Sequence, residues 1–444
     1  MTVVGMGRTA LAVVKLLLRE GARPFVTEAK SGNTFAQACV ELEALGVPYE
    51  LGGHTGAAFE GASLIVPSPG VPPAKIPLPA SCRADVISEM EFAFPYCRSR
   101  IIAVTGTNGK TTTTELLKTL LAGCGRSVGL AGNNDVPLSA VVTEESAPEY
   151  LVLEVSSYQL ELAHAFRPWA AAVLNVTPDH LARHGTIENY AAVKARIYTN
   201  QDVEDLAVVN DDDPFVRAMA DSTCARLWPF SLEHRLHDGL WLDGESILLG
   251  DECVAQTSDT LLPGRHNLQN VLCALSIMRA GGFDWNKTLA ALRTFGGVEH
   301  RIEFVVRACG VDFYNDSKAT NVDSLKVALE SFSIPVVLIA GGEGKGSDYR
   351  VLRDLIRQRV RHLVLIGDDA PKIEVAYGDL VPFECATDMR DAVQRAAAAA
   401  QPGDAVLLSP ACASFDMYTS FEHRGRVFKD AVMDYARGTR EGLS

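Results

Sequence analysis

One stretch of the sequence decides the fold: Ile101-Ile102-Ala103-Val104-Thr105-Gly106-Thr107-Asn108-Gly109-Lys110-Thr111-Thr112-Thr113-Thr114. Its first four residues predict a buried strand, its two glycines a tight turn, and the segment from Lys110 onwards a helix. In such a turn the backbone N–H groups and the helix N-terminus surround an anion. Lys110 can reach the outer phosphates of a nucleotide, and the Thr111 hydroxyl can bind Mg²⁺. The stretch therefore predicts a phosphate-binding loop for ATP or GTP rather than an ordinary strand-to-helix turn, although Val104 replaces the first glycine of the common pattern.

The whole chain is acidic and has an ordinary globular composition. It has 444 residues, of which 47% are apolar, and a formal net charge of −14 at pH 7. This length predicts two or three domains. The charge argues against a nucleic-acid or anionic-membrane partner, and no apolar run is long enough to span a bilayer. The ten cysteines are scattered without C-x-x-C pairs and no signal peptide is evident, so we expect reduced thiols in a cytoplasmic protein.

The first residues predict a small nucleotide-binding domain. Thr2–Ala10 gives a strand and a G-x-G-x-x-A turn, and a second strand ends at Glu28. This is the spacing of the dinucleotide-binding fingerprint, which alone is a weak signal. A third strand, Ser63–Val66, ends in a proline-rich loop at the edge where such sheets bind ligands. We expect a Rossmann-like domain over residues 1–90, with little room for the second half that NAD binding normally uses.

Strands and helices alternate through the rest of the chain. After residue 90 the pattern predicts a doubly wound, mostly parallel sheet with a small antiparallel insert between residues 227 and 260. The glycine pair at 296–297 follows a complete helix and indicates a hinge, after which the alternation resumes. The predicted class is α/β with three domains: the Rossmann-like domain over 1–90, a central phosphate-loop domain over 91–297 and a second Rossmann-like domain over 298–444.

Polar residues follow the strands of the central domain at the edge that carries the phosphate loop. Glu154 ends an apolar strand, so its carboxylate can share Mg²⁺ with Thr111 and a nucleotide. A strand end that faces solvent is the alternative. Asp179 and His180 follow the next strand and are candidates for a second metal or for phosphate positioning. Lys194 lies at the margin of an amphipathic helix, where the residue pattern alone indicates a solvated lysine.

Three loops of the last domain have residues suited to small polar ligands. Asn315–Asn321 offers Asp, Lys and Thr side chains that could hold a nucleotide and a polar substrate, or form a solvated turn. Gly341–Gly346 has the glycine spacing of an anion loop but lacks a hydroxyl residue after Lys345, which is better suited to a carboxylate. Ser409–Asp416 ends a strand in small residues and hydroxyls. Cys412 has no histidine partner in a recognisable pattern, so we expect a packed, unreactive thiol.

Together these motifs resemble those of the Mur ligases, the ATP-dependent amide-forming enzymes of peptidoglycan precursor synthesis. The similarity runs essentially end to end. The family motifs are Thr105–Thr112, Glu154–Leu160, Asn175–His180, Gly264–Asn270 and His300–Glu303. The branch that adds D-glutamate to UDP-N-acetylmuramoyl-L-alanine is indicated by Ser68–Pro72, Asn315–Asn321 and Ser409–Tyr418. The chain departs from the family at Asn134-Asp135, where the family has Ile-Gly, and in a shorter first strand.

The resemblance implies a role for each motif residue. It implies catalytic roles for Lys110, Glu154, His180 and Lys194, and two Mg²⁺ sites formed by Thr111, Glu154, His180 and Lys194. Lys194 is similar to the lysine that CO₂ carbamylates in the family, which makes it an anionic metal ligand. The resemblance assigns ATP to Gly106, Thr107, Asn108, Gly109, Lys110, Thr111, Thr112, Asn270, Arg301 and Asp316. It assigns the UDP-sugar to Gly7, Arg8, Thr9, Glu28, Ser68, Gly70, Asn133, Ser156 and Gln159, and D-glutamate to Thr320, Lys345, Ser414 and Phe421.

The resemblance also implies a reaction and its setting. ATP would convert the L-alanyl carboxylate into an acyl phosphate, which the amine of D-glutamate would attack, with the C-terminal domain closing over the site. We expect a monomer that serves cell-wall synthesis, cell shape and cell division, with small-molecule substrates only. The alternatives are a sister ligase, a folylpolyglutamate synthetase-like ligase, an ATP-gated binding protein of a different class, and an NAD-binding regulator for the N-terminal turn.

Overall fold

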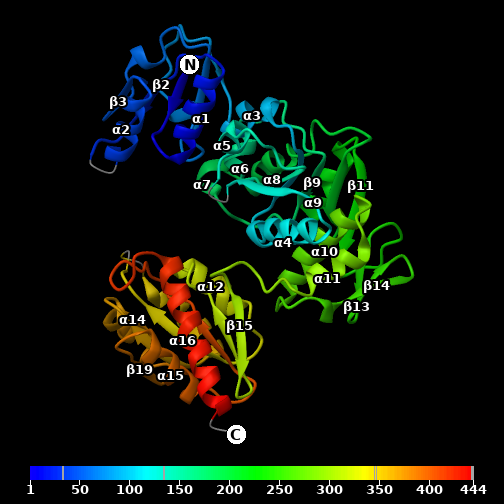
Figure 1. The fold of residues 1–444 in the computed structure, drawn as a ribbon, viewed down its shortest axis with the longest axis vertical. Helices are drawn as coiled ribbons and strands as arrows, with labels where there is room; N and C mark the ends of the chain where they lie inside the picture. Colours follow the sequence, from blue (N-terminus) through cyan, green and yellow to red (C-terminus); the bar gives the residue numbers. More distant parts are fainter. Residues whose placement is uncertain (33–34, 134–135, 345, 347, 442–444) are drawn as a thin grey trace. The chain divides into compact units, whose positions relative to one another are not determined.

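The chain has an α/β fold, which confirms the predicted class. The computed structural model describes residues 1–32, 35–133, 136–344, 346 and 348–441. They form two compact units, Met1–Asp259 with Gln269–Leu292, and Thr260–Leu268 with Arg293–Ser444. The first unit contains two sheets and the second contains one (Figure 1). The predicted domain boundaries at residues 90 and 297 stay a prediction.

The first sheet is parallel and runs in the order β3-β2-β1-β4-β5. Its strands are β1 (Thr2–Val4), β2 (Phe25–Glu28), β3 (Tyr49–Leu51), β4 (Leu64–Pro67) and β5 (Asp85–Val86), connected in part by helices α1 (Arg8–Arg19) and α2 (Ala36–Ala44). The strand order reverses between β1 and β4. Open parallel sheets bind ligands at such a point, and the turn after β1 and the proline-rich loop after β4 both lie there.

The second sheet runs in the order β14-β13-β12-β11-β10-β9-β6-β8-β7. Its strands are β6 (Arg100–Thr105), β7 (Val128–Gly132), β8 (Tyr150–Glu154), β9 (Ala170–Val173), β10 (Leu206–Asn210), β11 (Arg226–Ser231), β12 (Leu240–Asp243), β13 (Ser246–Leu249) and β14 (Glu252–Gln256). Only β12-β13-β14 pair antiparallel, so the predicted antiparallel insert extends this sheet. Because β6 lies between β8 and β9, the segments that follow these three strands share one edge.

The helices that accompany the second sheet pack their apolar faces against it. They are α3 (Glu89–Ala93), α4 (Lys110–Gly123), α5 (Leu138–Thr143), α6 (Ser157–Leu160), α7 (Leu181–His184), α8 (Ile187–Ala195), α9 (Pro214–Met219), α10 (Arg265–Ala280) and α11 (Trp285–Leu292). In α4 the leucines at 116, 117, 120 and 121 are fully buried, at the spacing that places them on one face. Burying each contributes roughly 1.5–3 kcal/mol.

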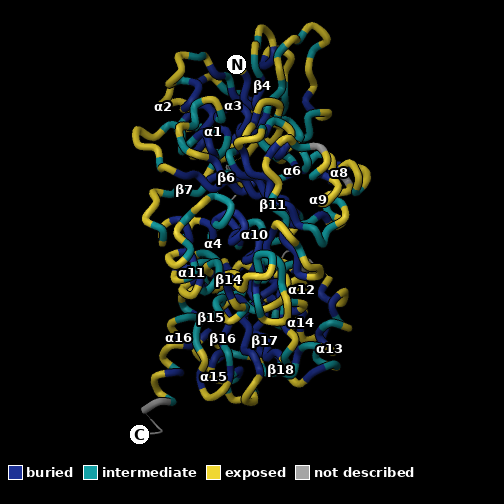
Figure 2. The backbone as a smooth tube through the Cα atoms, turned by 90° about the vertical axis from the view of Figure 1, so that its right-hand side faces the viewer, coloured by how far each residue is buried: buried dark blue, intermediate teal, exposed yellow. Residues whose placement is uncertain are grey.

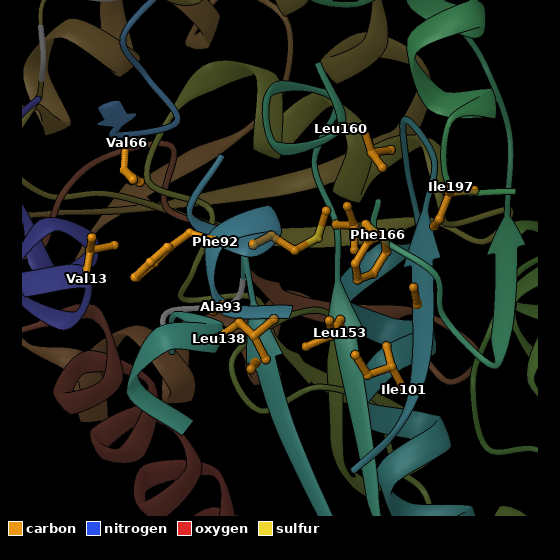
Figure 3. Close-up of a cluster of buried hydrophobic side chains, with 14 of the residues drawn as sticks. Val13, Val66, Phe92, Ala93, Ile101, Leu138, Leu153, Leu160, Phe166 and Ile197 are labelled. Atoms are coloured by element: carbon orange, nitrogen blue, oxygen red, sulfur yellow. The ribbon is translucent and has the colours of Figure 1, made fainter. Parts of the chain in front are cut away.

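One hydrophobic cluster joins the first two sheets. Phe92 and Ala93 of α3 lie among Val13 of α1, Leu138 of α5 and Leu153 of β8 (Figure 3). All of these side chains are buried. The short helix α3 therefore lies inside a core that both sheets share.

The third sheet runs in the order β15-β16-β20-β17-β18-β19, with only β15 antiparallel. Its strands are β15 (Glu303–Ala308), β16 (Val311–Asn315), β17 (Val336–Gly341), β18 (Val360–Ile366), β19 (Phe383–Cys385) and β20 (Ala405–Leu408). The helices are α12 (Val322–Glu330), α13 (Arg353–Arg359), α14 (Ala370–Tyr377), α15 (Met389–Ala399) and the long α16 (Phe421–Glu441). The central strand β17 is buried throughout (Figure 2), and the three predicted ligand loops follow β16, β17 and β20.

Two findings concern the chain as a whole. None of the helices in the described part of the chain combines the length and the apolarity that a bilayer crossing requires. The ten cysteines, all within the described residues, are free thiols as predicted.

A buried carboxylate fixes α3 to the central domain. The two oxygens of Glu91 accept hydrogen bonds from the backbone N–H groups of Ala165 (2.6 Å) and Phe166 (3.0 Å). Glu91 is 8% exposed. Both N–H groups precede β9; Phe166 is buried and Ala165 is exposed, so loss of the carboxylate leaves one buried donor, the Phe166 N–H, without this acceptor.

We therefore predict that Glu91→Ala lowers the free energy of unfolding by about 1–3 kcal/mol, measured by urea denaturation, because the buried Phe166 N–H loses its acceptor. The matched control is Glu149→Ala, which removes a half-exposed ion pair with Arg126 and should cost less than about 1 kcal/mol. Equal losses in the two variants would show that Glu91 does not act as a buried acceptor.

Candidate active site

The phosphate-binding loop lies at the carboxyl end of β6. Gly106 and Gly109 have φ angles of 152° and 85°, which residues other than glycine rarely adopt. A Cβ atom on Gly109 would stand 2.2 Å from Oδ1 of Asn270, so the loop fits against α10 only with glycine there. Helix α4 begins directly after Gly109, at Lys110. The loop and the helix N-terminus thus form the anion site that the sequence predicts.

The loop is held in shape by its own lysine and by the segment after β9. Lys110 Nζ donates hydrogen bonds to the carbonyl oxygens of Gly106 (3.0 Å) and Thr107 (2.8 Å). The backbone N–H of Asn108 donates to Oδ1 of Asn175 (2.9 Å). The Lys110 charge therefore stays over the loop, and Asn175 has a supporting role that sequence reasoning missed, although its motif was identified.

A hydroxyl and a carboxylate meet where the start of α4 faces the end of β8. Thr111 Oγ1 donates to Oε2 of Glu154 at 2.8 Å, and Nδ2 of Asn133 donates to Oε1 at 3.0 Å. Glu154 is only 3% exposed, so the alternative of a solvent-facing strand end is wrong. A hydroxyl and a carboxylate beside a phosphate loop are the oxygen donors that Mg²⁺ takes when nucleotide phosphates and water complete its shell. The residues present therefore fit a magnesium ion.

Lys194 is buried, which corrects the solvated lysine that its helix pattern indicates. Its side chain is 1% exposed. Nζ donates to the carbonyl oxygen of Gly106 at 2.8 Å and lies 4.5 Å from the ring centre of Tyr190. Burial, together with the charge of Lys110, lowers the pKa of the Lys194 ammonium to about 7. Tyr190 was also missed, although its spacing of four residues from Lys194 on one helix places the two side chains together.

The other predicted metal ligand lies in the loop after β9. His180 has a positive φ of 52° and is the residue that directly precedes α7. Its Nε2 is 3.4 Å from Oδ2 of Asp179, and its ring centre is 5.0 Å from that of Tyr158. Both the histidine and the aspartate are half-exposed. His180 as a metal ligand stays a prediction.

A polar cavity of about 140 Å³ lies between the first two sheets. It is lined by Arg8, Thr9, Pro69, Glu89, Gly132, Asn133, Pro137 and Gln159. Four of these, namely Arg8, Thr9, Asn133 and Gln159, are residues for which the sequence predicts contact with the UDP-sugar. Because Asn133 also donates to Glu154, the cavity borders the predicted magnesium ligand Glu154. Gln159 belongs to the capping box that begins α6, together with Ser156.

The remaining predicted UDP-sugar residues shape the first turn. Oε2 of Glu28 accepts from the backbone N–H of Met6 at 3.1 Å, and Gly7 is the residue that precedes α1. A Cβ atom on Gly5 would stand 2.4 Å from the Ser68 hydroxyl, so the loops after β1 and β4 are in close contact. Gly70 lies in the second of these loops.

In the second unit, Asp316 is a buried carboxylate beside the loop after β20. Its Oδ2 accepts from the Ser409 hydroxyl (2.7 Å) and its Oδ1 from the backbone N–H of Ile302 (3.2 Å). Burial raises the pKa of the Asp316 carboxyl to about 7, although these hydrogen bonds and the charge of Arg301 oppose the rise. Asn270 lies in the first unit and both Arg301 and Asp316 in the second.

Three of the predicted D-glutamate residues lie near one buried arginine, Arg424. Its guanidinium donates to the carbonyl oxygens of Ser317 (2.8 Å) and Ala413 (3.0 Å). Ser317 precedes Thr320 by three residues, and Ala413 directly precedes Ser414. The Ser317 hydroxyl donates to the carbonyl oxygen of Phe421 (2.8 Å). Burial lowers the pKa of Arg424 to about 10. Sequence reasoning missed Arg424, although its position three residues after Phe421 places both on one helix face.

Lys345, predicted to bind D-glutamate, and the departure at Asn134-Asp135 lie outside the described residues. Cys412 is fully buried, and burial raises the pKa of its thiol to about 11. The prediction of a packed thiol is confirmed, and its lack of reactivity stays a prediction.

The raised pKa of Asp316 has a consequence for stability. An acid whose pKa is raised on folding binds more protons in the folded state, so its contribution to stability is lost as pH rises from about 4 to 7. Asp316→Asn removes this titration. We predict that the variant gains roughly 2–3 kcal/mol relative to the wild-type chain between pH 5 and pH 8, measured by urea unfolding at both pH values.

The control for this measurement is Asp379→Asn, at an exposed aspartate that pairs with Arg353. The Arg353 hydrogen bond lowers the pKa of Asp379, so its titration ends below pH 5 and its variant should show the same difference at both pH values. A pH-independent effect of Asp316→Asn would contradict the raised pKa.

Three family models match the chain: the MurD-like N-terminal domain of Mur ligases over residues 1–87, the Mur ligase middle domain over 104–278, and the Mur ligase glutamate ligase domain over 300–412. The middle-domain match begins within β6 and includes the phosphate loop, Glu154, His180 and Lys194.

Curated relatives and solved structures agree with these matches. The UDP-N-acetylmuramoylalanine–D-glutamate ligase of Pelotomaculum thermopropionicum is 43% identical, over 98% of both chains. The enzyme of the same name from Geotalea uraniireducens is 42% identical, over 97% of this chain and 96% of its own. The structure of UDP-N-acetylmuramate-alanine ligase MurC from Thermotoga maritima has a TM-score of 0.56 at 17% identity over 98% of this chain and 99% of its own, which shows a shared fold. The chain, from its first parallel sheet to the sheet whose strand β16 precedes Asp316, belongs to the Mur ligase family.

Proposed function

We propose that the chain is an ATP-dependent ligase that joins the amine of D-glutamate to the L-alanyl carboxylate of UDP-N-acetylmuramoyl-L-alanine, in peptidoglycan precursor synthesis. The observation that carries the proposal is the arrangement of Lys110, Thr111 and Glu154 around one phosphate loop, with Lys194 buried against the same loop. The relatives that match over nearly their whole length have the name of this activity. A nucleotide-binding module without chemistry would not need the buried carboxylate and lysine.

The first unit has the groups that hold ATP. The backbone N–H groups of residues 106–111 and the N-terminus of α4 bind the phosphates, and the Lys110 ammonium attracts the outer ones. Thr111 and Glu154 would hold Mg²⁺, which when bound neutralises charge on the phosphates. A second Mg²⁺ at His180 and a modified Lys194 is part of the proposal, as are nucleotide contacts by Asn270, Arg301 and Asp316.

The reaction has two chemical steps. An oxygen of the L-alanyl carboxylate attacks the γ-phosphorus of ATP, the bond to the bridging oxygen breaks, and ADP leaves. Lys110 stabilises the charge on the transferring phosphoryl group. The neutral amine of D-glutamate then attacks the carbonyl carbon of the acyl phosphate. Phosphate leaves with the former carboxylate oxygen, and the amine loses its proton to form the amide.

The two other substrates have separate places in the proposal. The cavity between the first two sheets, with Arg8, Thr9, Asn133 and Gln159, takes part of the UDP-sugar. Thr320, Lys345, Ser414 and Phe421 are proposed to contact D-glutamate. The cytoplasmic location and the monomeric state stay predictions.

Lys194 is proposed to react with CO₂. Its amine nitrogen would attack the carbon of CO₂ and lose a proton, which replaces an ammonium by an anionic carbamate. The low pKa supports this step, because only the neutral amine is nucleophilic and Lys194 is substantially neutral near pH 7. The carbamate would supply an anionic oxygen ligand for the second Mg²⁺.

The proposed activity predicts that Lys110→Ala lowers kcat/KM for amide formation by about a thousandfold or more, because charge on the transferring phosphoryl group loses its neutralising partner. The assay measures ADP release with UDP-N-acetylmuramoyl-L-alanine, ATP and D-glutamate. Lys118→Ala is the matched control, since Lys118 lies on the same helix and pairs with Glu115 at the surface; it should keep wild-type activity.

The same assay separates the alternatives. A wild-type chain that prefers another amino acid to D-glutamate is a sister ligase, and one that prefers a folate is a folylpolyglutamate synthetase. ATP turnover that needs neither the UDP-sugar nor an amino acid would overturn the ligase proposal in favour of an ATP-gated binding protein.

The carbamate predicts a spectroscopic signal. Incubation with ¹³C-bicarbonate should give a carbamate carbonyl resonance in the ¹³C NMR spectrum that is stronger at pH 8 than at pH 6, because the neutral amine is the reactive form. Lys194→Met should lack the resonance and Lys118→Met should retain it. A spectrum that is identical in the wild type and Lys194→Met rules out the carbamate at this position.

A further inference from the structure

One buried carboxylate of the second unit has no place in the proposed reaction. Asp369 lies just before α14 and is 4% exposed. Its Oδ2 accepts a hydrogen bond from the Tyr349 hydroxyl at 2.8 Å, and its Oδ1 accepts from Nζ of Lys372 at 2.6 Å. Replacing a buried carboxylate that has two such partners costs free energy. The groups that surround Asp369 therefore indicate its role.

The glycine loop after β17 lies directly on this carboxylate. A Cβ atom on Gly344 would stand 1.6 Å from Oδ2 of Asp369, so the Gly344 backbone is in van der Waals contact with the charged group. The backbone N–H of Asp369 donates to the carbonyl oxygen of Gly342 at 2.9 Å. Asp369 therefore contacts the loop at two points, one on each side of Glu343.

The same carboxylate reaches the loop after β20 through Tyr349. The Tyr349 oxygen lies 3.0 Å from Sγ of Cys412, and because the hydroxyl proton is donated to Asp369, the thiol donates to the tyrosine oxygen. The Tyr349 backbone is fixed as well, since its carbonyl oxygen accepts from the Tyr377 hydroxyl at 2.7 Å. Tyr349 and Cys412 are both buried.

The two loops also pair with each other. Glu343 and Ala413 exchange backbone hydrogen bonds of 3.1 and 2.9 Å. This short bridge lies between the Asp369 contacts on the glycine loop and the Cys412 contact on the other loop. Ser414, a predicted contact of the acceptor amino acid, directly follows Ala413.

We propose that Asp369 is a positioning residue for the acceptor amino acid: with Tyr349 it holds the glycine loop 341–344 against the loop 412–414 and so fixes the spacing of the groups that receive an acidic amino acid. This inference rests on the proposed function, because it assumes that these loops bind D-glutamate. Loss of the carboxylate removes the link through Tyr349 but keeps the Glu343–Ala413 bridge, so the two loops stay paired while their spacing is less well fixed. The effect falls on recognition of the amino acid and leaves the ATP and UDP-sugar sites of the first unit unchanged.

Steady-state kinetics with each of the three substrates varied in turn tests the proposal. Asp369→Asn should raise KM for D-glutamate about tenfold and Tyr349→Phe about threefold, with kcat and the other two KM values within about twofold of wild type. The double variant should resemble Asp369→Asn alone, because Tyr349 acts through the same carboxylate. Asp379→Asn, the same substitution at an exposed aspartate of this unit, is the control and should leave all constants unchanged.

The outcomes separate the two proposals. If the wild-type chain forms no amide with D-glutamate, the proposed function fails. If it does, but both variants retain the wild-type KM for D-glutamate or change all three KM values alike, the positioning role of Asp369 is wrong. If Asp369→Asn does not fold, Tyr349→Phe decides, since it removes one hydroxyl and keeps the carboxylate and its Lys372 partner.

Discussion

The hydrogen bond from Thr111 to Glu154 connects the first turn of α4 to the end of β8. It exists because β6 and β8 are neighbours in a parallel sheet, so that the loop after one strand meets the last residue of the other. The second oxygen of Glu154 accepts from Asn133, which follows β7 and borders the polar cavity of the first unit. One carboxylate therefore connects the start of α4, through Thr111, with the wall of the polar cavity, through Asn133.

Three charged side chains are buried close to the loops that the proposed reaction uses. Lys194, Asp316 and Arg424 are each less than 5% exposed. Burial shifts the pKa of each in the direction that favours the neutral form. Burying a charge with neutral partners costs free energy that a stable core would avoid. Such groups persist where a function requires them. Their positions, one against the phosphate loop and two beside the predicted ligand loops, agree with the proposed ligase.

Local patterns predicted the parts of the site that follow strands. The phosphate loop and Glu154 could be predicted because an apolar run, glycines and a polar residue at a strand end are adjacent in the sequence. The burial of Lys194 could not, since the pattern of α8 does not say which face packs on the loop after β6. Arg424 and Asp369 were missed for a similar reason: their partners, Ser317 and Tyr349, are 107 and 20 residues away, and a lone charge in a sequence indicates the surface.

In the proposed reaction the γ-phosphate of ATP is transferred to the L-alanyl carboxylate before the amide forms. The most direct measurement uses UDP-N-acetylmuramoyl-L-alanine labelled with ¹⁸O in that carboxylate, with ATP and D-glutamate, followed by mass analysis of the inorganic phosphate. An acyl-phosphate route moves one labelled oxygen into the phosphate for each amide made. Phosphate without label, alongside amide product, would contradict the account.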